Sequence, residues 1–207
     1  MKYFRTLLFL VSFFLFSGGL DAKNILYIAS YNMDMNWAKL CHEGVMSTIG
    51  PRHTVESIFM NTKNRPEFEH RGIVDKVWLE ILDKKPDLVM LADDNALKYL
   101  SPKLEKTKIK VVFLGINANP RDYFSKNRFP ENFHGVLERF LFAPLIRGAK
   151  QFLPMKKNRV LLLFDESPTS NSIVKVSLYN KNRMSLSGTT IEWKAISYYD
   201  NWKEIVG

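Results

Sequence analysis

Short apolar runs alternate along the chain with apolar residues at helical spacing. Three of these runs, residues 24–30 (NILYIAS), 87–92 (DLVMLA) and 159–164 (RVLLLF), have the length of buried strands. Between the first two, apolar residues recur at i, i+3, i+4, i+7 and i+8 from Val74 onwards, which is the pattern of a helix packed on a sheet. Continuous apolar strands separated by amphipathic helices predict an α/β chain with parallel sheets flanked by helices.

The same pattern predicts an ordered set of elements over most of the chain. Strands are expected at residues 24–30, 54–60, 87–92, 110–114, 133–137, 159–164 and 189–196. Helices are expected at residues 37–49, 74–82, 95–100, 145–153, 173–184 and 200–206. Pro102 follows the third helix closely, and we expect it to kink or end that helix because proline lacks the backbone donor.

The first 22 residues have the layout of a secretory signal peptide. Lys2 and Arg5 precede an apolar core at residues 6–16, and Ala22 offers a small residue for cleavage. The core is shorter than the ~20 residues that a membrane-spanning helix needs. We therefore expect a cleaved signal at residues 1–22 and a periplasmic location for the rest of the chain.

Composition and charge narrow the classes of function. The 207 residues are 46% hydrophobic and 25% charged, which is typical of a globular protein and not of a disordered one. The single cysteine excludes an internal disulfide. The formal net charge is +9, but its basic groups accompany no nucleic-acid motif. We expect a solvated basic face, no nucleic-acid partner and a monomer.

The common catalytic motifs are missing from the sequence. It contains no G-x-G-x-x-G after the first strand, no phosphate-binding loop and no G-x-S-x-G nucleophile elbow. Its four histidines do not have metal-ligand spacing. The acidic pairs at 93–94 and 165–166 leave an enzyme as a distant hypothesis, because adjacent side chains usually point apart. We expect a protein that is not an enzyme and has no metal or cofactor.

Short polar side chains gather where the predicted strands end. In an open α/β sheet, ligands sit beyond the carboxyl ends of the strands. The candidate ligand-binding residues are therefore Ser30, Tyr31, Asp93, Asp94, Asn95, Gly115, Asn117, Glu138, Asp165, Glu166 and Ser167. Asp94 and Ser167 equally suit the role of helix caps. Trp37 joins the candidates because its ring could stack on a ligand, although it equally suits a structural role at the start of a helix.

Four stretches in this order and spacing resemble one protein family. They are ILYIASYNMDMNW, KPDLVMLADDNALKYL, VVFLGINANPRDY and GVLERFLFAPLIRGAKQFLPMKKNRVLLLFDESPTSNS. The chain resembles the periplasmic substrate-binding proteins of ABC transporters, of the tryptophan/tyrosine type, over roughly residues 24–200. The resemblance implies a type I periplasmic binding fold, in which two α/β lobes clamp a small molecule such as an amino acid and deliver it to a membrane permease.

The same module also resembles the extracellular sensor part of some signalling proteins, so the alternative function is ligand sensing for a membrane partner. The expected lobes are residues 23–142 and 143–207. The second range contains only two clear predicted strands, whereas each pair of parallel strands with its crossover needs roughly 30 residues. We therefore expect an incomplete second lobe and a chain that is truncated at its C-terminus.

Overall fold

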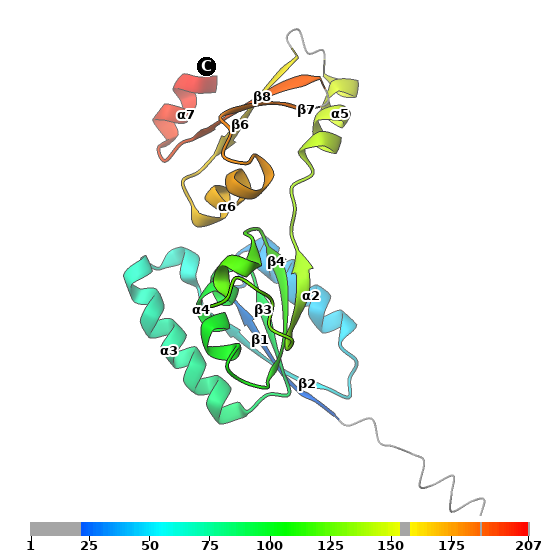
Figure 1. Ribbon diagram of the computed structural model, residues 1–207, viewed down its shortest axis with the longest axis vertical. Coiled ribbons are helices and arrows are strands. Elements are labelled where there is room, and N and C mark those ends of the chain that lie inside the picture. Colours follow the sequence, from blue (N-terminus) through cyan, green and yellow to red (C-terminus); the bar gives the residue numbers. More distant parts are fainter. Residues whose placement is uncertain (1–21, 154–157, 187, 207) are drawn as a thin grey trace, which may run out of the picture.

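The computed structural model of the protein describes residues 22–153, 158–186 and 188–206. The expected signal peptide therefore lies outside the described residues, except for Ala22. Strands and helices alternate along these ranges and build two separate sheets (Figure 1). None of the helices in the described part of the chain has the length and hydropathy needed to cross a bilayer.

Five parallel strands form the first sheet, in the spatial order β2-β1-β3-β4-β5. They are β1 (Asn24–Ala29), β2 (Thr54–Phe59), β3 (Leu88–Ala92), β4 (Lys110–Ile116) and β5 (Phe133–Leu137). Each of these ranges overlaps a strand that the sequence pattern predicts. Because all five strands are parallel, their carboxyl ends meet along one edge of the sheet.

Helices cover both faces of this first sheet. They are α2 (Asn36–Thr48), α3 (Glu67–Lys84) and α4 (Asp94–Leu104), with 3-10 turns η1 (Thr62–Asn64) and η2 (Pro120–Tyr123). Successive side chains of β1 alternate between the two faces. Leu26 and Ile28 belong to the core shared with α3 and α4, whereas Tyr27 and Ala29 belong to the core on the α2 side. This two-sided burial explains why the sequence shows continuous apolar runs here.

A smaller sheet forms the second half of the fold. It contains β6 (Arg159–Phe164), β7 (Arg183–Leu186) and β8 (Thr189–Ala195) in the order β6-β8-β7. Its helices are α5 (Phe142–Phe152), α6 (Pro168–Ser177) and α7 (Tyr199–Val206). Its buried core takes Phe142 and Ile146 from α5, Ile173 and Val174 from α6, and Ile191 from β8.

We call the first sheet with α2, α3 and α4 the first lobe, and the second sheet with α5, α6 and α7 the second lobe. The chain passes between them once, through residues 138–141 (Figure 1). Arg139 anchors this crossover to the first lobe: its guanidinium donates to the carbonyls of Ile116, Asn117 and Glu138 at 2.6–3.1 Å and to that of Ala118 at 3.3 Å.

The structure confirms the α/β class with a parallel sheet flanked by helices, and it corrects three details. The helix expected at 173–184 is wrong over its second half, because α6 ends at Ser177 and Arg183–Leu186 forms β7. This strand runs antiparallel to β8, so the second sheet is mixed. Pro102 neither ends α4 at residue 100 nor stops its last turn, since the helix continues to Leu104.

Candidate ligand-binding site

The carboxyl ends of the first-lobe strands face the N-terminus of α6 in the second lobe (Figure 1). A cavity of about 280 Å³ lies at this junction. Seven of the twelve candidate residues line it: Tyr31, Trp37, Asp93, Asn117, Glu138, Asp165 and Ser167. Six of them follow the ends of five different strands and Trp37 lies at the start of α2, so the parallel topology brings together side chains that are far apart in the sequence. We call this the acidic cavity.

Asp93 is the most deeply placed carboxyl group of the acidic cavity. It is 4% exposed, and its side chain accepts the backbone N–H of Asp94 at the start of α4. Burial, together with the negative charges of Asp94 and Glu138, raises the pKa of Asp93 to about 7. A shift of this size means that ionising the Asp93 carboxyl costs about 4 kcal/mol more in the folded chain than in water. The carboxylate therefore benefits strongly from a positive charge placed beside it.

The backbone of Asp93 is also unusual. Its φ of 75° and ψ of 165° lie in a region that residues other than glycine almost never occupy. Such a conformation costs about 1–3 kcal/mol and persists only where the surrounding structure imposes it. Here the strand end, the helix start and the bonds of Asp94 to the next strand end fix the geometry.

Asn117 and Glu138 lie beside Asp93 in the same cavity. The Asn117 side chain is 5% exposed, and its Nδ2 donates to the Glu138 carboxylate at 3.4 Å. Its Oδ1 is buried and has no hydrogen-bond partner within the described structure. A buried acceptor without a partner costs about 1–3 kcal/mol. The two carboxylates and this oxygen give the residues around this end of the cavity an excess of hydrogen-bond acceptors.

Aromatic rings provide the apolar part of the acidic cavity. Trp37, Tyr31 and Phe140 all line it. A Cβ added at Gly115, where φ is +69°, would lie 2.5 Å from the Trp37 ring. Gly115 therefore creates the space in which the indole rests, and Trp37 has a packing role while still lining the cavity. Burial is the largest cause of the raised pKa of Tyr31, so its hydroxyl stays protonated and able to donate.

The second lobe contributes short polar side chains around the start of α6. Asp165 accepts hydrogen bonds from the hydroxyls of Ser167 and Ser170. Partial burial opposes its ionisation, but these bonds outweigh burial and hold the pKa of Asp165 below its usual value. Thr169 meets Tyr31 of the first lobe, with 3.3 Å between the two hydroxyl oxygens. The second lobe therefore brings a permanent negative charge and several hydroxyls to the cavity.

Three candidate residues do not line the cavity but contact the segments that do. Ser30 donates to the carbonyl of Ala92 and accepts from the N–H of Ala96, which joins β1 to β3 and α4. Asp94 accepts from the N–H groups of Asn117 and Ala118 and from the Tyr123 hydroxyl. Gly115 is the third, through its contact with Trp37.

The two remaining candidate residues lie away from the acidic cavity. Asn95 lines a neighbouring cavity, described below, and donates to Thr62. Glu166 is exposed and accepts from Ser197. The helix-cap hypothesis holds for Ser167, whose hydroxyl accepts the Ser170 N–H. The helix-cap hypothesis is wrong for Asp94, because the residue that caps α4 is Asp93.

A second cavity of about 400 Å³ adjoins the first at the junction of the lobes. Tyr31, Lys63, Ser167 and Thr169 line both cavities. The rest of its lining includes Arg65, Glu67, His70, Asn95, Lys98 and Tyr99. We call it the basic cavity because three cationic side chains face one carboxylate across its lining.

Sequence reasoning missed Lys63 and Phe140 as lining residues of the acidic cavity. Lys63 follows β2, whose carboxyl end lies at the same sheet edge as the others, and this position was a signal that the strand pattern contained. Phe140 belongs to the crossover between the lobes, and no strand-end rule marks it.

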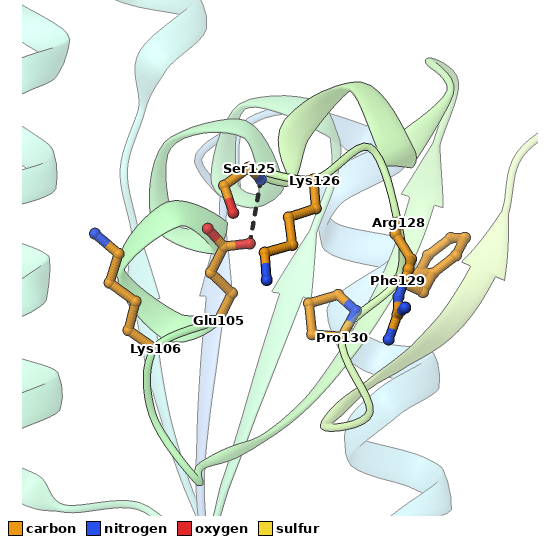
Figure 2. Close-up of a pocket in the computed structure, with 7 residues that line it drawn as sticks. All are labelled: Glu105, Lys106, Ser125, Lys126, Arg128, Phe129 and Pro130. Carbon is orange, nitrogen blue, oxygen red and sulfur yellow. Dashed lines mark hydrogen bonds between the residues drawn. The ribbon is translucent and has the colours of Figure 1, made fainter.

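A third cavity, of about 310 Å³, lies apart from the lobe junction, between the end of α4 and the loop that leads to β5 (Figure 2). Figure 2 shows Lys106, Lys126 and Arg128 around it, with the Glu105 carboxylate accepting the Ser125 N–H at 3.2 Å. It contains none of the twelve candidate residues. Among the described residues no cluster of three or more His, Cys, Asp or Glu side chains is arranged to hold a metal ion.

The solved structures that are similar to the chain include two that cover most of its length. The ligand-free, open structure of CD0873, a substrate binding protein with adhesive properties from Clostridium difficile, matches with a TM-score of 0.52 and 12% identity, over 88% of this chain and 60% of that one. The ABC domain in complex with L-Trp from Streptococcus pneumonia matches with a TM-score of 0.54 and 14% identity, over 87% of this chain and 59% of that one.

The similarity lies in the fold and not in a close sequence relationship. No protein-family model matches the chain, and no curated protein matches it in sequence. The chain spans about 60% of the length of each of the two solved proteins. The α/β fold, a five-stranded parallel sheet with flanking helices followed by a second mixed sheet, is shared with these two solved proteins.

Proposed function

We propose that the chain is a periplasmic substrate-binding protein, which captures a small molecule with an amino group, such as an amino acid, for an ABC transporter. The observation that carries the proposal is the set of acceptors in the acidic cavity. Asp93, Asn117 and Glu138 present two carboxylates and one buried oxygen without a partner. An ammonium group would satisfy all three at once through charge-assisted hydrogen bonds.

The position of the acidic cavity supports binding between two lobes. First-lobe residues supply the buried acceptors and the aromatic rings, while α6 of the second lobe supplies hydroxyls and the Asp165 carboxylate. A ligand that touches both sets would hold the lobes together. The two solved structures of this fold support the same class of function, because one is described as a substrate binding protein and the other as a complex with L-Trp.

The experiment that tests this function is calorimetric titration of the purified full-length chain with L-tryptophan. We expect saturable binding without turnover, and a loss of at least tenfold in affinity in Asp93→Asn. The matched control is Asp75→Asn, because Asp75 is exposed on α3 and pairs with Lys103 outside both cavities. Equal binding by the wild type and Asp93→Asn would remove the ammonium site from the account.

The membrane partner is tested separately from the ligand. We expect the chain to co-purify with an ABC permease from membranes of the host when the ligand is present. Recovery of a membrane signalling protein in place of the permease would favour the sensing role.

A further inference from the structure

The two adjoining cavities at the lobe junction differ in the sign of their charge. The acidic cavity contains three carboxylates, of Asp93, Glu138 and Asp165, and one cation, Lys63. The basic cavity contains the cations of Lys63, Arg65 and Lys98 and one carboxylate, of Glu67. A ligand that fills both therefore meets negative charge at one end and positive charge at the other.

The order of the strands sets the distance between these charges. Lys63 follows β2 and Asp93 follows β3, and the two strands lie on either side of β1. Neighbouring strands are about 4.8 Å apart, so these two strand ends are about 10 Å apart along the sheet edge. The backbone positions that carry Lys63 and Asp93 are therefore well separated along this edge, and the Lys63 side chain reaches far enough to lower the pKa of Asp165 as well.

A free amino acid does not match this separation. Its ammonium nitrogen and carboxylate carbon are attached to one Cα and are only about 2.5 Å apart. An extended peptide gains at most about 3.5 Å per residue, so two or three residues span about 7–10 Å. The size of the cavities agrees with a ligand of this length. At about 280 and 400 Å³ they jointly lie within the range of ligand pockets, which is roughly 300–1000 Å³.

The cations of the basic cavity can turn toward a ligand. Arg65 pairs with Glu69 at 3.3 Å and Lys98 pairs with Glu67 at 3.7 Å, and both pairs are exposed to solvent. Exposed pairs of this kind contribute little to stability, so replacing one partner with a ligand carboxylate costs little. The Nζ of Lys63 lies 5.8 Å from the centre of the Tyr31 ring, and both residues line both cavities.

A weak contact joins two residues that line both cavities. The hydroxyl oxygens of Tyr31 and Thr169 are 3.3 Å apart, whereas hydroxyl hydrogen bonds are normally about 2.5–3.0 Å long. Both groups line both cavities, so they are available to the peptide groups of a ligand that lies across them.

We propose that the two cavities form one cleft for a peptide of two or three residues, with its ammonium group at Asp93 and Asn117 and its carboxylate among Lys63, Arg65 and Lys98. This inference rests on the proposed function and specifies its ligand. The aromatic lining of the acidic cavity places the preferred aromatic side chain on the first residue of the peptide. The serine and threonine hydroxyls of α6 face the peptide groups in the middle.

The test is a calorimetric series with the full-length chain and four probes. The probes are L-tryptophan, Trp-Gly, Trp-Gly-Gly, and the C-terminal amide of whichever peptide binds more tightly. We expect at least one peptide to bind tenfold more tightly than L-tryptophan, and we expect the amide to lose at least tenfold because its terminal charge is gone. Equal affinities for L-tryptophan and both peptides, or an amide as tight as its parent, would overturn the peptide proposal and leave the proposed function intact.

A pair of double variants provides the matched control. Arg65→Gln with Lys98→Gln removes two charges from the basic cavity alone, and we expect a tenfold loss for the peptide and little change for L-tryptophan. Lys106→Gln with Lys126→Gln removes two charges at the separate cavity of Figure 2 and should leave both affinities unchanged. A peptide affinity that is the same in both double variants would contradict the inference. Failure of all four probes to bind the wild type would count against both proposals.

Discussion

The two lobes of the chain bury their sheets to different extents. The first sheet has helices on both faces, and the central strand β1 is buried on both sides, with Tyr27 and Ile28 fully inaccessible. In the second sheet, α5 and α6 contribute to one core, and Leu161 of β6 is still 41% exposed. Burial on both faces holds the strand ends of the first sheet in fixed positions. The second sheet has one principal core, so less buried surface fixes its strand ends.

This difference matches the division of groups around the cavities. The buried acceptors, Asp93 and Asn117, belong to the first lobe, and the strained backbone of Asp93 needs a rigid surrounding. The second lobe contributes hydroxyls and an exposed carboxylate at the start of one helix. Under the proposed function, the first lobe would hold the ligand and the second would close over it.

The largest expected effect separates the stabilities of the two lobes. Ile28→Ala leaves a cavity in the centre of the first core and should destabilise that lobe by about 2–5 kcal/mol. Ile191→Ala, in the core of the second lobe, should destabilise the second lobe and leave the first folded. Hydrogen exchange of peptides from β1 and β8 measures the two lobes separately. Equal loss of protection in both lobes with either variant would show that they unfold as one unit.

The next effect is the pH dependence that Asp93 gives to the first lobe. Its pKa is about 7 in the folded chain and near 3.8 in a model peptide, so the folded state holds its proton more tightly. The stability from this group is complete below pH 4 and is lost as the pH rises through 7, a change of up to about 4 kcal/mol. Asp93→Asn should lack this loss.

Urea unfolding of the wild type and Asp93→Asn at pH 5 and pH 8 measures that difference, since all other groups titrate in both proteins. We expect the variant to gain stability relative to the wild type at pH 8. A constant difference between the two proteins at both pH values would place the pKa of Asp93 near its ordinary value.

A smaller effect is expected at the crossover between the lobes. Arg139→Ala leaves the carbonyls of residues 116–118 and 138 without their charged donor, and each such hydrogen bond contributes about 1.5–3 kcal/mol at most. Water molecules replace some of the lost hydrogen bonds, so we expect about 1–3 kcal/mol of destabilisation and a weaker ligand affinity. Arg159→Ala, which removes an exposed ion pair of the second lobe, is the comparison for a surface arginine. Chemical denaturation measures the loss of stability in both variants. An equal loss in Arg139→Ala and Arg159→Ala would contradict this role of Arg139.

The smallest effect concerns the ion pair that joins the lobes directly. Lys175 of α6 lies 2.9 Å from Asp122 of η2, and both side chains are largely exposed. Exposed pairs contribute about 0.2–1 kcal/mol. Lys175→Ala should therefore change ligand affinity less than about fivefold, and calorimetry in low and high salt should show the wild type approaching the variant as salt screens the pair. A larger and salt-independent loss would mean that Lys175 contacts the ligand.

Much of the first lobe could be predicted from its apolar runs, because strands buried on both faces are continuously apolar. The strand ends then marked six lining residues of the acidic cavity, since parallel strands bring their carboxyl ends together, and the stacking capacity of its ring marked the seventh, Trp37. The pattern failed at β7, whose four residues alternate in burial and fit a helical spacing as well as a strand.

The separation of charge between the two cavities could not be predicted from the sequence. It depends on β1 lying between β2 and β3, and this spatial order does not follow from the order of strands along the chain. It also depends on Arg65 and Lys98, which belong to a loop and to the second turn of a helix. Neither position is distinguished from an ordinary surface cation until the lobes are placed against each other.

The central claim is that Asp93 and its neighbours hold an amine between the two lobes. The most direct test is native mass spectrometry of the wild type and Asp93→Asn, purified gently from the cells that produce them. The account predicts that the wild type retains a small molecule with an amino group, and that the variant does not. A wild type without a retained molecule, or the same molecule bound equally to both proteins, would contradict it.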